Sequence, residues 1–111
     1  MKWYPNDTSG IVVAGGNGAG SKYNQLNNPQ AVYVDLFGTV YVADYNNHRI
    51  MKWRKNTTNG TLVAGISGSA GTSPAHLYNP SGIYFDKNGD MYVSEYSNDR
   101  IQRFTIDTTS C

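Results

Sequence analysis

The sequence predicts an all-β fold made of β-propeller blades. Three observations support this: the composition, an internal repeat, and four strand-forming runs in each repeat. The chain has 111 residues, of which 39% are hydrophobic and 15% charged, with 12 Gly and 9 Tyr. Globular proteins usually contain about 45–50% apolar and about 25% charged residues. Gly, Asn, Ser and Thr are poor helix formers, so this composition excludes a coiled coil and disfavours a helical bundle.

The repeat consists of two copies of one pattern. The segment 1–3, Met-Lys-Trp, recurs at 51–53, and Asn28-Pro29 recurs as Asn79-Pro80, so the offset changes from 50 to 51 residues. A period near 50 residues is typical of propeller blades and solenoids. Further pairs at the offset of 51 are Tyr33 and Tyr84, Asp35 and Asp86, Gly38 and Gly89, Asn47 and Asn98, Arg49 and Arg100, and Ile50 and Ile101.

Each repeat holds four short runs rich in β-branched and aromatic residues, which favour strands. The inner two runs are apolar at consecutive positions, which indicates a sheet covered on both faces. Asn88-Gly89 adds a strong hairpin signal. Each repeat is therefore predicted to be a four-stranded antiparallel meander, stacked between copies of itself as a propeller blade. From the expected propeller axis outward, the runs are 31–34 and 83–85, 40–43 and 91–93, 50–53 and 101–104, and 11–14 and 61–64.

The order of these runs divides the chain into two blades per chain, cut in a shifted frame. Residues 28–65 form a complete blade, and residues 79–106 form a blade that lacks its own outer strand. Residues 11–14 are then an outer strand that completes the blade of a neighbouring chain. Residues 1–10 are a surplus segment, a partly displaced copy of the third strand, and residues 107–111 are a tail.

Two blades cannot close a ring, because propellers contain roughly 4–8 blades. Alone, they would expose two apolar faces and open strand edges. We expect a closed ring of identical chains, with six blades from three chains favoured over eight blades from four. The alternative is a piece of a longer propeller, found as an aggregate or a swapped oligomer. The residues expected to pair between chains are Ile11, Val12, Val13 and Ala14 on one side and Ile101, Arg103 and Phe104 on the other.

The two copies also resemble a known repeat family, the NHL repeat. The residues that carry the resemblance in the first copy are Asn28-Pro29, Asp35, Gly38, Tyr-Val-Ala-Asp at 41–44 and Asn-His-Arg-Ile at 47–50. The second copy departs from them, with Asp99 in place of His48 and Tyr-Val-Ser-Glu at 92–95. The resemblance covers nearly the whole chain. It implies a β-propeller, commonly of six blades, that acts mostly as a binding platform.

Two polar patterns invite a chemical interpretation. Residues 15–22 approach a phosphate-binding loop, but Ser21 precedes Lys22 and no helix follows, so we interpret them as a flexible connection. A set of carboxylate, Asn and Arg side chains recurs in both copies, which favours a turn network that stabilises each blade over a catalytic cluster. These structural residues are Asp44, Asn47, Arg49, Glu95, Asn98 and Arg100.

A weaker pattern suggests a ligand surface. Aromatic and basic residues fall in the long loops and in the turns after the second strand, which share one face of a propeller. These candidate ligand-binding residues are Lys22, Tyr23, Tyr45, His48, His76, Tyr78 and Tyr96. A catalytic zinc site usually takes three protein ligands, whereas this chain has two His at non-equivalent positions. We therefore predict no metal, no cofactor and no catalytic residue.

The sequence predicts a non-enzymatic module that self-assembles into a symmetric ring and serves as a binding or scaffold platform. The alternative is a metal-dependent lyase or hydrolase with its site on the ring axis. The expected partner is the chain itself; no ligand is named. Nucleic acid is not expected, because the net charge is +1 and the basic residues are scattered. No apolar run approaches the roughly 20 residues of a membrane span, and the sequence assigns neither an extracellular nor a cytoplasmic location.

Overall fold

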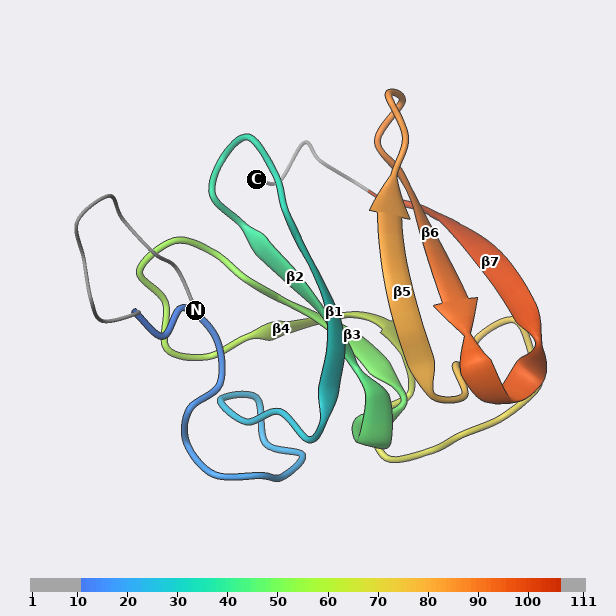
Figure 1. Ribbon diagram of the computed structural model, residues 1–111, viewed down its shortest axis with the longest axis horizontal. Helices are drawn as coiled ribbons and strands as arrows, with labels where there is room; N and C mark the ends of the chain where they lie inside the picture. The colour runs from blue at the N-terminus through green and yellow to red at the C-terminus, as the bar shows by residue number, and fades with distance from the viewer. Residues whose placement is uncertain (1–10, 107–111) are drawn as a thin grey trace.

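The computed structural model describes residues 11–106 and consists of two antiparallel sheets that stand side by side (Figure 1). The predicted surplus segment 1–10 and tail 107–111 lie outside the described residues. The first sheet contains β1 (Pro29–Val34), β2 (Val40–Asp44), β3 (Arg49–Trp53) and β4 (Thr61–Gly65) in that order. The second contains β5 (Pro80–Phe85), β6 (Asp90–Glu95) and β7 (Arg100–Thr105). Two short 3-10 turns follow the second strands: η1 (Tyr45–Asn47) and η2 (Tyr96–Asn98).

The all-β class and the antiparallel meanders are thus confirmed. Within residues 11–106, neither helical turn has the length or apolar character needed to cross a membrane. The inner strands begin earlier than predicted, because Pro29 already pairs with Asp44, and Pro80 with Glu95. Each of these pairs is followed by a register shift, so a bulge marks the start of both inner strands.

The hairpins between first and second strands have one construction in both sheets. The Asp35 carboxylate accepts hydrogen bonds from the backbone N–H groups of Phe37 and Thr39, at 2.9 and 3.0 Å. Asp86 does the same in the second sheet, at 2.9 and 3.0 Å. Each turn contains a glycine in the left-handed region, Gly38 with φ of +81° and Gly89 with φ of +83°. The paired Asp and Gly of each repeat therefore specify one tight turn.

The main hydrophobic core lies between the two sheets. Every second residue of β2 points toward the second sheet, so Tyr41 and Ala43 face Met91 and Val93 across the interface. The half-buried ring of Phe85, at the end of β5, packs against this interface. Its centroid is 4.7 Å from the rings of both Tyr33 and Tyr41. The two sheets therefore pack face to face through the alternate residues of their strands. The buried members of the cluster are Tyr41, Ala43, Ile50, Ala64, Leu77, Met91 and Val93.

The opposite face of the first sheet forms a second, less covered cluster. It contains Val40, Val42, Met51 and Trp53, with Ala14, Leu26 and Leu62 packed against them. Toward the β1 edge this face opens to solvent, since Val32 and Val34 remain 63% and 56% exposed. Residues 11–14 belong to none of the described strands. Their predicted partner strand lies in another chain, and β4 already occupies the outer edge of the first sheet. The inter-chain pairing therefore stays a prediction.

Candidate functional site

The polar residues of the first repeat form a buried network between β2 and β3. Asp44 ends β2 and Arg49 begins β3, so their side chains emerge next to each other around η1. Arg49 Nε lies 2.7 Å from Asp44 Oδ2, and neither side chain has any exposed surface. Asn47 Nδ2 donates to the same oxygen at 2.8 Å. The other oxygen of Asp44 accepts from the backbone N–H of Asn27 at 2.7 Å.

The remaining nitrogens of Arg49 bind the loop that precedes β1. They donate to the carbonyls of Ser21, Lys22 and Gln25 at 2.9, 3.1 and 2.9 Å. Asn47 Nδ2 also reaches the carbonyl of Gly20 at 2.8 Å. A guanidinium has five donors in a rigid fork, and here they hold a loop that has no strand of its own. Residues 15–22 are therefore an anchored connection.

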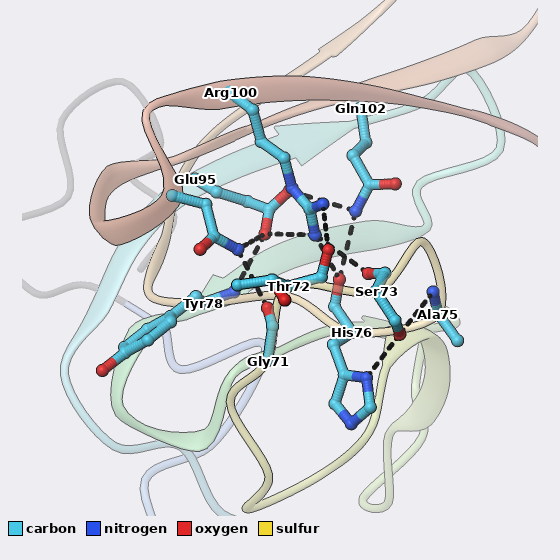
Figure 2. Close-up of polar contacts among 10 residues, drawn as sticks. Gly71, Thr72, Ser73, Ala75, His76, Tyr78, Glu95, Arg100 and Gln102 are labelled. Carbon is cyan, nitrogen blue, oxygen red and sulfur yellow. Dashed lines mark hydrogen bonds and ion pairs between the residues drawn. The ribbon is translucent and has the colours of Figure 1, made fainter.

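The second repeat builds the same network with Glu95 in place of Asp44 (Figure 2). Arg100 Nε lies 2.6 Å from Glu95 Oε2, and the guanidinium donates to the carbonyls of Thr72, Ser73 and His76 at 2.7, 3.0 and 3.1 Å. Each of these contacts is the first-repeat contact displaced by 51 residues. Two more contacts follow the same rule: Asn98 Nδ2 to Gly71 O at 2.9 Å, and Tyr78 N–H to Glu95 Oε1 at 3.0 Å.

The second network also contains a residue without a polar counterpart. Gln102 Nε2 donates to Glu95 Oε2 at 3.0 Å and to His76 O at 3.1 Å, whereas the equivalent residue in the first repeat is Met51. Burial by itself would raise the pKa of Glu95. Hydrogen bonds from Arg100, Asn98 and Gln102, together with the charge of Arg100, outweigh burial and lower the pKa.

Both oxygens of Asp44 and both oxygens of Glu95 accept hydrogen bonds within these networks. Within residues 11–106, every buried side-chain polar atom has a hydrogen-bond partner. In the same part of the chain, no three His, Cys, Asp or Glu side chains gather closely enough to hold a metal ion. The geometry of the two networks therefore supports a structural task, in which each one fastens a long loop to the second and third strands of its blade.

Four of the seven candidate ligand-binding residues meet where the ends of the two blades touch. The ring centroids of Tyr45 and Tyr96 are 6.4 Å apart, and those of His48 and Tyr78 are 5.5 Å apart with the two rings nearly perpendicular. Asn79 joins the blades at this point. Its N–H donates to His48 Nδ1 at 3.1 Å, and its side chain donates to Tyr45 O at 3.2 Å. Burial lowers the pKa of His48, and the charge of Asp44 offsets only part of this effect.

The other three candidates lie in the long loops. Lys22 contributes its carbonyl to Arg49, and the carbonyl of Tyr23 accepts from the N–H of Gly60 at 2.6 Å. His76 Nδ1 and Ser73 Oγ are 2.6 Å apart, and its carbonyl belongs to the Arg100 network. The backbones of all three therefore take part in the architecture of their loops.

Sequence reasoning missed two contributors. Asn79 has an equivalent in Asn28, and the recurrence of Asn before Pro was the signal that could have found it. Gln102 carried no such signal, because a polar residue in one copy and Met51 in the other do not form a repeat.

Comparison with known proteins identifies the repeats independently. The family model described as NHL repeat matches residues 26–53 and 77–104, which hold the three inner strands of each blade. NHL repeat-containing protein 3 of Mus musculus is 31% identical over 101 residues, covering 88% of this chain and 28% of its own length. The Homo sapiens protein of that name is 31% identical over 87 residues, covering 76% and 24%. The chain thus spans about a quarter of the length of these relatives.

Proposed function

The chain belongs to the NHL-repeat family, and from this premise we propose that it is a non-enzymatic propeller module that self-assembles into a symmetric ring and serves as a binding and scaffold platform. NHL repeats suggest a propeller-type protein-interaction module. Six blades from three copies is the proposed composition. An enzymatic alternative with an axial metal draws no support from residues 11–106, where no three His, Cys, Asp or Glu side chains gather to hold a metal ion and both oxygens of each repeated carboxylate accept hydrogen bonds.

The observation that carries the proposal is a match between two faces of the molecule. The face of the first blade that packs against the second blade presents Tyr33, Tyr41 and Ile50. Of the corresponding residues of the second blade, Tyr84 and Ile101 are 64% and 71% exposed, and Tyr92 is half-buried. The second blade therefore carries the same kind of face, with nothing in the described chain packed on it. The equivalent pairs are Ala31 and Gly82, Tyr33 and Tyr84, Tyr41 and Tyr92, Ala43 and Ser94, and Ile50 and Ile101.

The complementary face shows the reverse. The second blade packs against the first through Ile83, Phe85, Met91 and Val93. Of the corresponding residues of the first blade, Val32 and Val34 are 63% and 56% exposed, whereas Val40 and Val42 are buried in the cluster against which Ala14 and Leu26 pack. A second copy could therefore dock on this chain with the geometry that joins the two blades within it. The equivalent pairs are Val32 and Ile83, Val34 and Phe85, Val40 and Met91, Val42 and Val93, and Trp53 and Phe104.

The segment before the first blade supports this further. Ala64 and Leu77 pack against the second blade, and their equivalents Ala14 and Leu26 pack against the first. Ala64 lies in β4, the outer strand of the blade that precedes the second one. Residues 11–14 hold the matching place beside the first blade. This is where the outer strand of a preceding blade would lie, completing the three-stranded sheet of a neighbouring copy along its β7 edge.

A head-to-tail contact uses two different surfaces, so it forms a closed ring where the rotation closes and a filament where it does not. The test is the mass in solution by light scattering or native mass spectrometry. The expected species has three times the chain mass of 12.2 kDa. A stable monomer at every concentration tested, with the circular dichroism spectrum of an intact β-sheet, would refute the ring.

A variant on the open face sharpens the test. Tyr84→Asp places a charge on the proposed interface at a side chain that is 64% exposed, so the blade itself should fold. The expected product is a monomer whose far-ultraviolet circular dichroism spectrum equals that of the unmodified chain. Asn59→Asp is the matched control: it makes the same charge change at an exposed position between β3 and β4, and should leave the trimer intact. Equal effects of both variants would contradict the proposed interface.

A further inference from the structure

We propose that the side chain after each 3-10 turn accepts a hydrogen bond from the backbone N–H that leads into the next blade, a contact that we call a clasp. His48 makes the clasp within the chain, and Asp99 makes it between one copy and the next. The two kinds of junction would then respond differently to acid. The Asp99 half rests on the proposed function, because it needs a second copy as the partner. The His48 half stands on contacts within one chain.

The His48 clasp is a direct contact across the blade junction. His48 follows η1 with a left-handed backbone, φ 56°, and its ring packs against Tyr78 in the loop that leads to the next blade. Its Nδ1 accepts the backbone N–H of Asn79, the residue that leads into β5. Asn79 also has a left-handed backbone, φ 51°, and precedes Pro80, which has no N–H to offer. The N–H of Asn79 is therefore the donor at this point of entry into the second blade.

The proposed second clasp has the same backbone on both sides. Asp99 ends η2 with φ 48°, and Asn28 leads into β1 with φ 59°. Asp99 is equivalent to His48, and Asn28 to Asn79, by the offset of 51. Asp99 and Asn28 are both exposed in the single chain, at the two ends that the ring would bring together. A carboxylate oxygen of Asp99 would accept the N–H of Asn28 of the next copy.

Charged neighbours differ between the two junctions. His48 is faced by the charge of Asp44 from β2 and by the Tyr78 ring from the loop before β5. The adjacent Arg49 is bound to Asp44 and to the carbonyls of the loop before β1. Asp99 lines a shallow pocket with Glu95 and Arg100 on its own blade. On the next copy the equivalent of Tyr78 is Asn27, which is uncharged.

Lowering the pH should weaken the His48 clasp and leave the Asp99 clasp intact. An imidazole that accepts a hydrogen bond at Nδ1 must be neutral on that nitrogen, and protonation turns the acceptor into a donor facing another donor. The folded chain therefore favours neutral His48, in agreement with a pKa below the usual 6.5. The clasp is complete above about pH 6.5 and weakens as the pH falls from there through the lower folded pKa. Imidazole is the side chain that ordinarily changes charge between pH 5 and 8. A carboxyl group keeps an acceptor oxygen whether or not it carries a proton, so the Asp99 clasp meets no such clash between two donors.

The experiment measures amide hydrogen exchange of Asn79 and Asn28 by NMR at pH 7.5 and 5.0, each corrected for the intrinsic exchange rate. In the unmodified chain, the protection of Asn79 should fall roughly fivefold at pH 5.0, the scale of one lost hydrogen bond. His48→Asp installs the residue that the second repeat uses, and should remove this acid response. Unchanged Asn79 protection at both pH values in the unmodified chain would overturn the His48 clasp.

The reciprocal variant tests the junction between copies. In the assembled protein, Asn28 should be protected equally at both pH values, and Asp99→His should make that protection fall at pH 5.0. A trimer in which Asp99→His leaves Asn28 protection unchanged at both pH values overturns the Asp99 clasp while the proposed function stands. A monomer at every concentration, with Asn28 unprotected, overturns the ring and the Asp99 clasp together, and the Asn79 measurement still decides the His48 clasp.

Discussion

The two blades have the same network but bury it differently. In the first blade both Arg49 and Asp44 are fully buried, whereas in the second the Arg100 side chain remains 27% exposed beside a buried Glu95. The first sheet has four strands and a blade on one side, and the second has three strands and an open face. One chain therefore contains the same set of contacts twice, once in a four-stranded sheet and once in a three-stranded sheet with an open face, which we call the unfinished blade. The comparison separates what the repeat sequence specifies from what neighbouring blades add.

Removing the arginine should show the largest difference between the two settings. Arg49→Ala leaves the buried carboxylate of Asp44 without its partner and frees three loop carbonyls, so we expect a loss of about 3–5 kcal/mol of unfolding free energy. Arg100→Ala removes the equivalent contacts in a more solvated place and should cost clearly less, because water replaces part of what is lost. Denaturant unfolding of the two variants at one protein concentration measures both.

The matched controls are Arg49→Lys and Arg100→Lys. Lysine keeps the charge but lacks the planar fork that reaches carboxylate and carbonyls at once, so both should remain destabilised. If the variants at positions 49 and 100 lose equal unfolding free energy, the difference in exposure between the two arginines does not affect their contribution to stability.

Acid should act on the second network in a defined direction. The pKa of Glu95 is lowered from its usual 4.5, so the unfolded chain binds a proton more readily than the folded one. The stabilisation by Glu95 is complete above about pH 4.5 and is lost as the pH falls through the lower folded pKa. Unfolding free energy measured between pH 6 and pH 3 should therefore decline toward the acid end. Glu95→Gln should flatten that decline, and a decline of undiminished slope would assign the acid sensitivity to other groups.

Much of this comparison can be predicted from the sequence, because the two copies of the repeat can be aligned with each other within one chain. The offset of 51 located both networks, and the Asp and Gly pairs located both hairpin turns, since these features depend on residues close together in the chain. The seven observed strands fall on the predicted runs, with ends that differ by up to three residues. The ends differ because bulges and tertiary pairing, as at Pro29 and Pro80, set where a strand starts.

Other features depend on packing between distant segments and could not be predicted. Residues 11–14 have strand-forming composition, but they belong to none of the described strands, and their predicted partner strand lies in another chain. The contact of His48 with Asn79 crosses 31 positions of sequence and depends on how the two blades stack. Residue type and loop position predict the candidate ligand-binding residues, but only the stacking of the blades brings Tyr45 against Tyr96 and His48 against Tyr78.

Gln102 offers the smallest and most specific test of the comparison. Its amide contributes two hydrogen bonds to Glu95 and His76 that the first blade lacks, at a position where the first blade has buried Met51. Gln102→Met would make the second network chemically like the first while removing donors that hold Glu95 ionised. We expect a loss of about 1 kcal/mol, since each neutral hydrogen bond contributes roughly that amount and the apolar side chain recovers part of it. The pKa of Glu95 should rise toward its usual value, as followed by carboxyl NMR titration.

The same variant can be measured in two states of assembly. If the extra amide supports only the unfinished blade, Gln102→Met should lower the unfolding free energy less in the assembled ring than in the Tyr84→Asp monomer, because a neighbouring outer strand would cover β7. Identical losses in both backgrounds would mean that the polar residue serves the blade itself, whatever stands beside it.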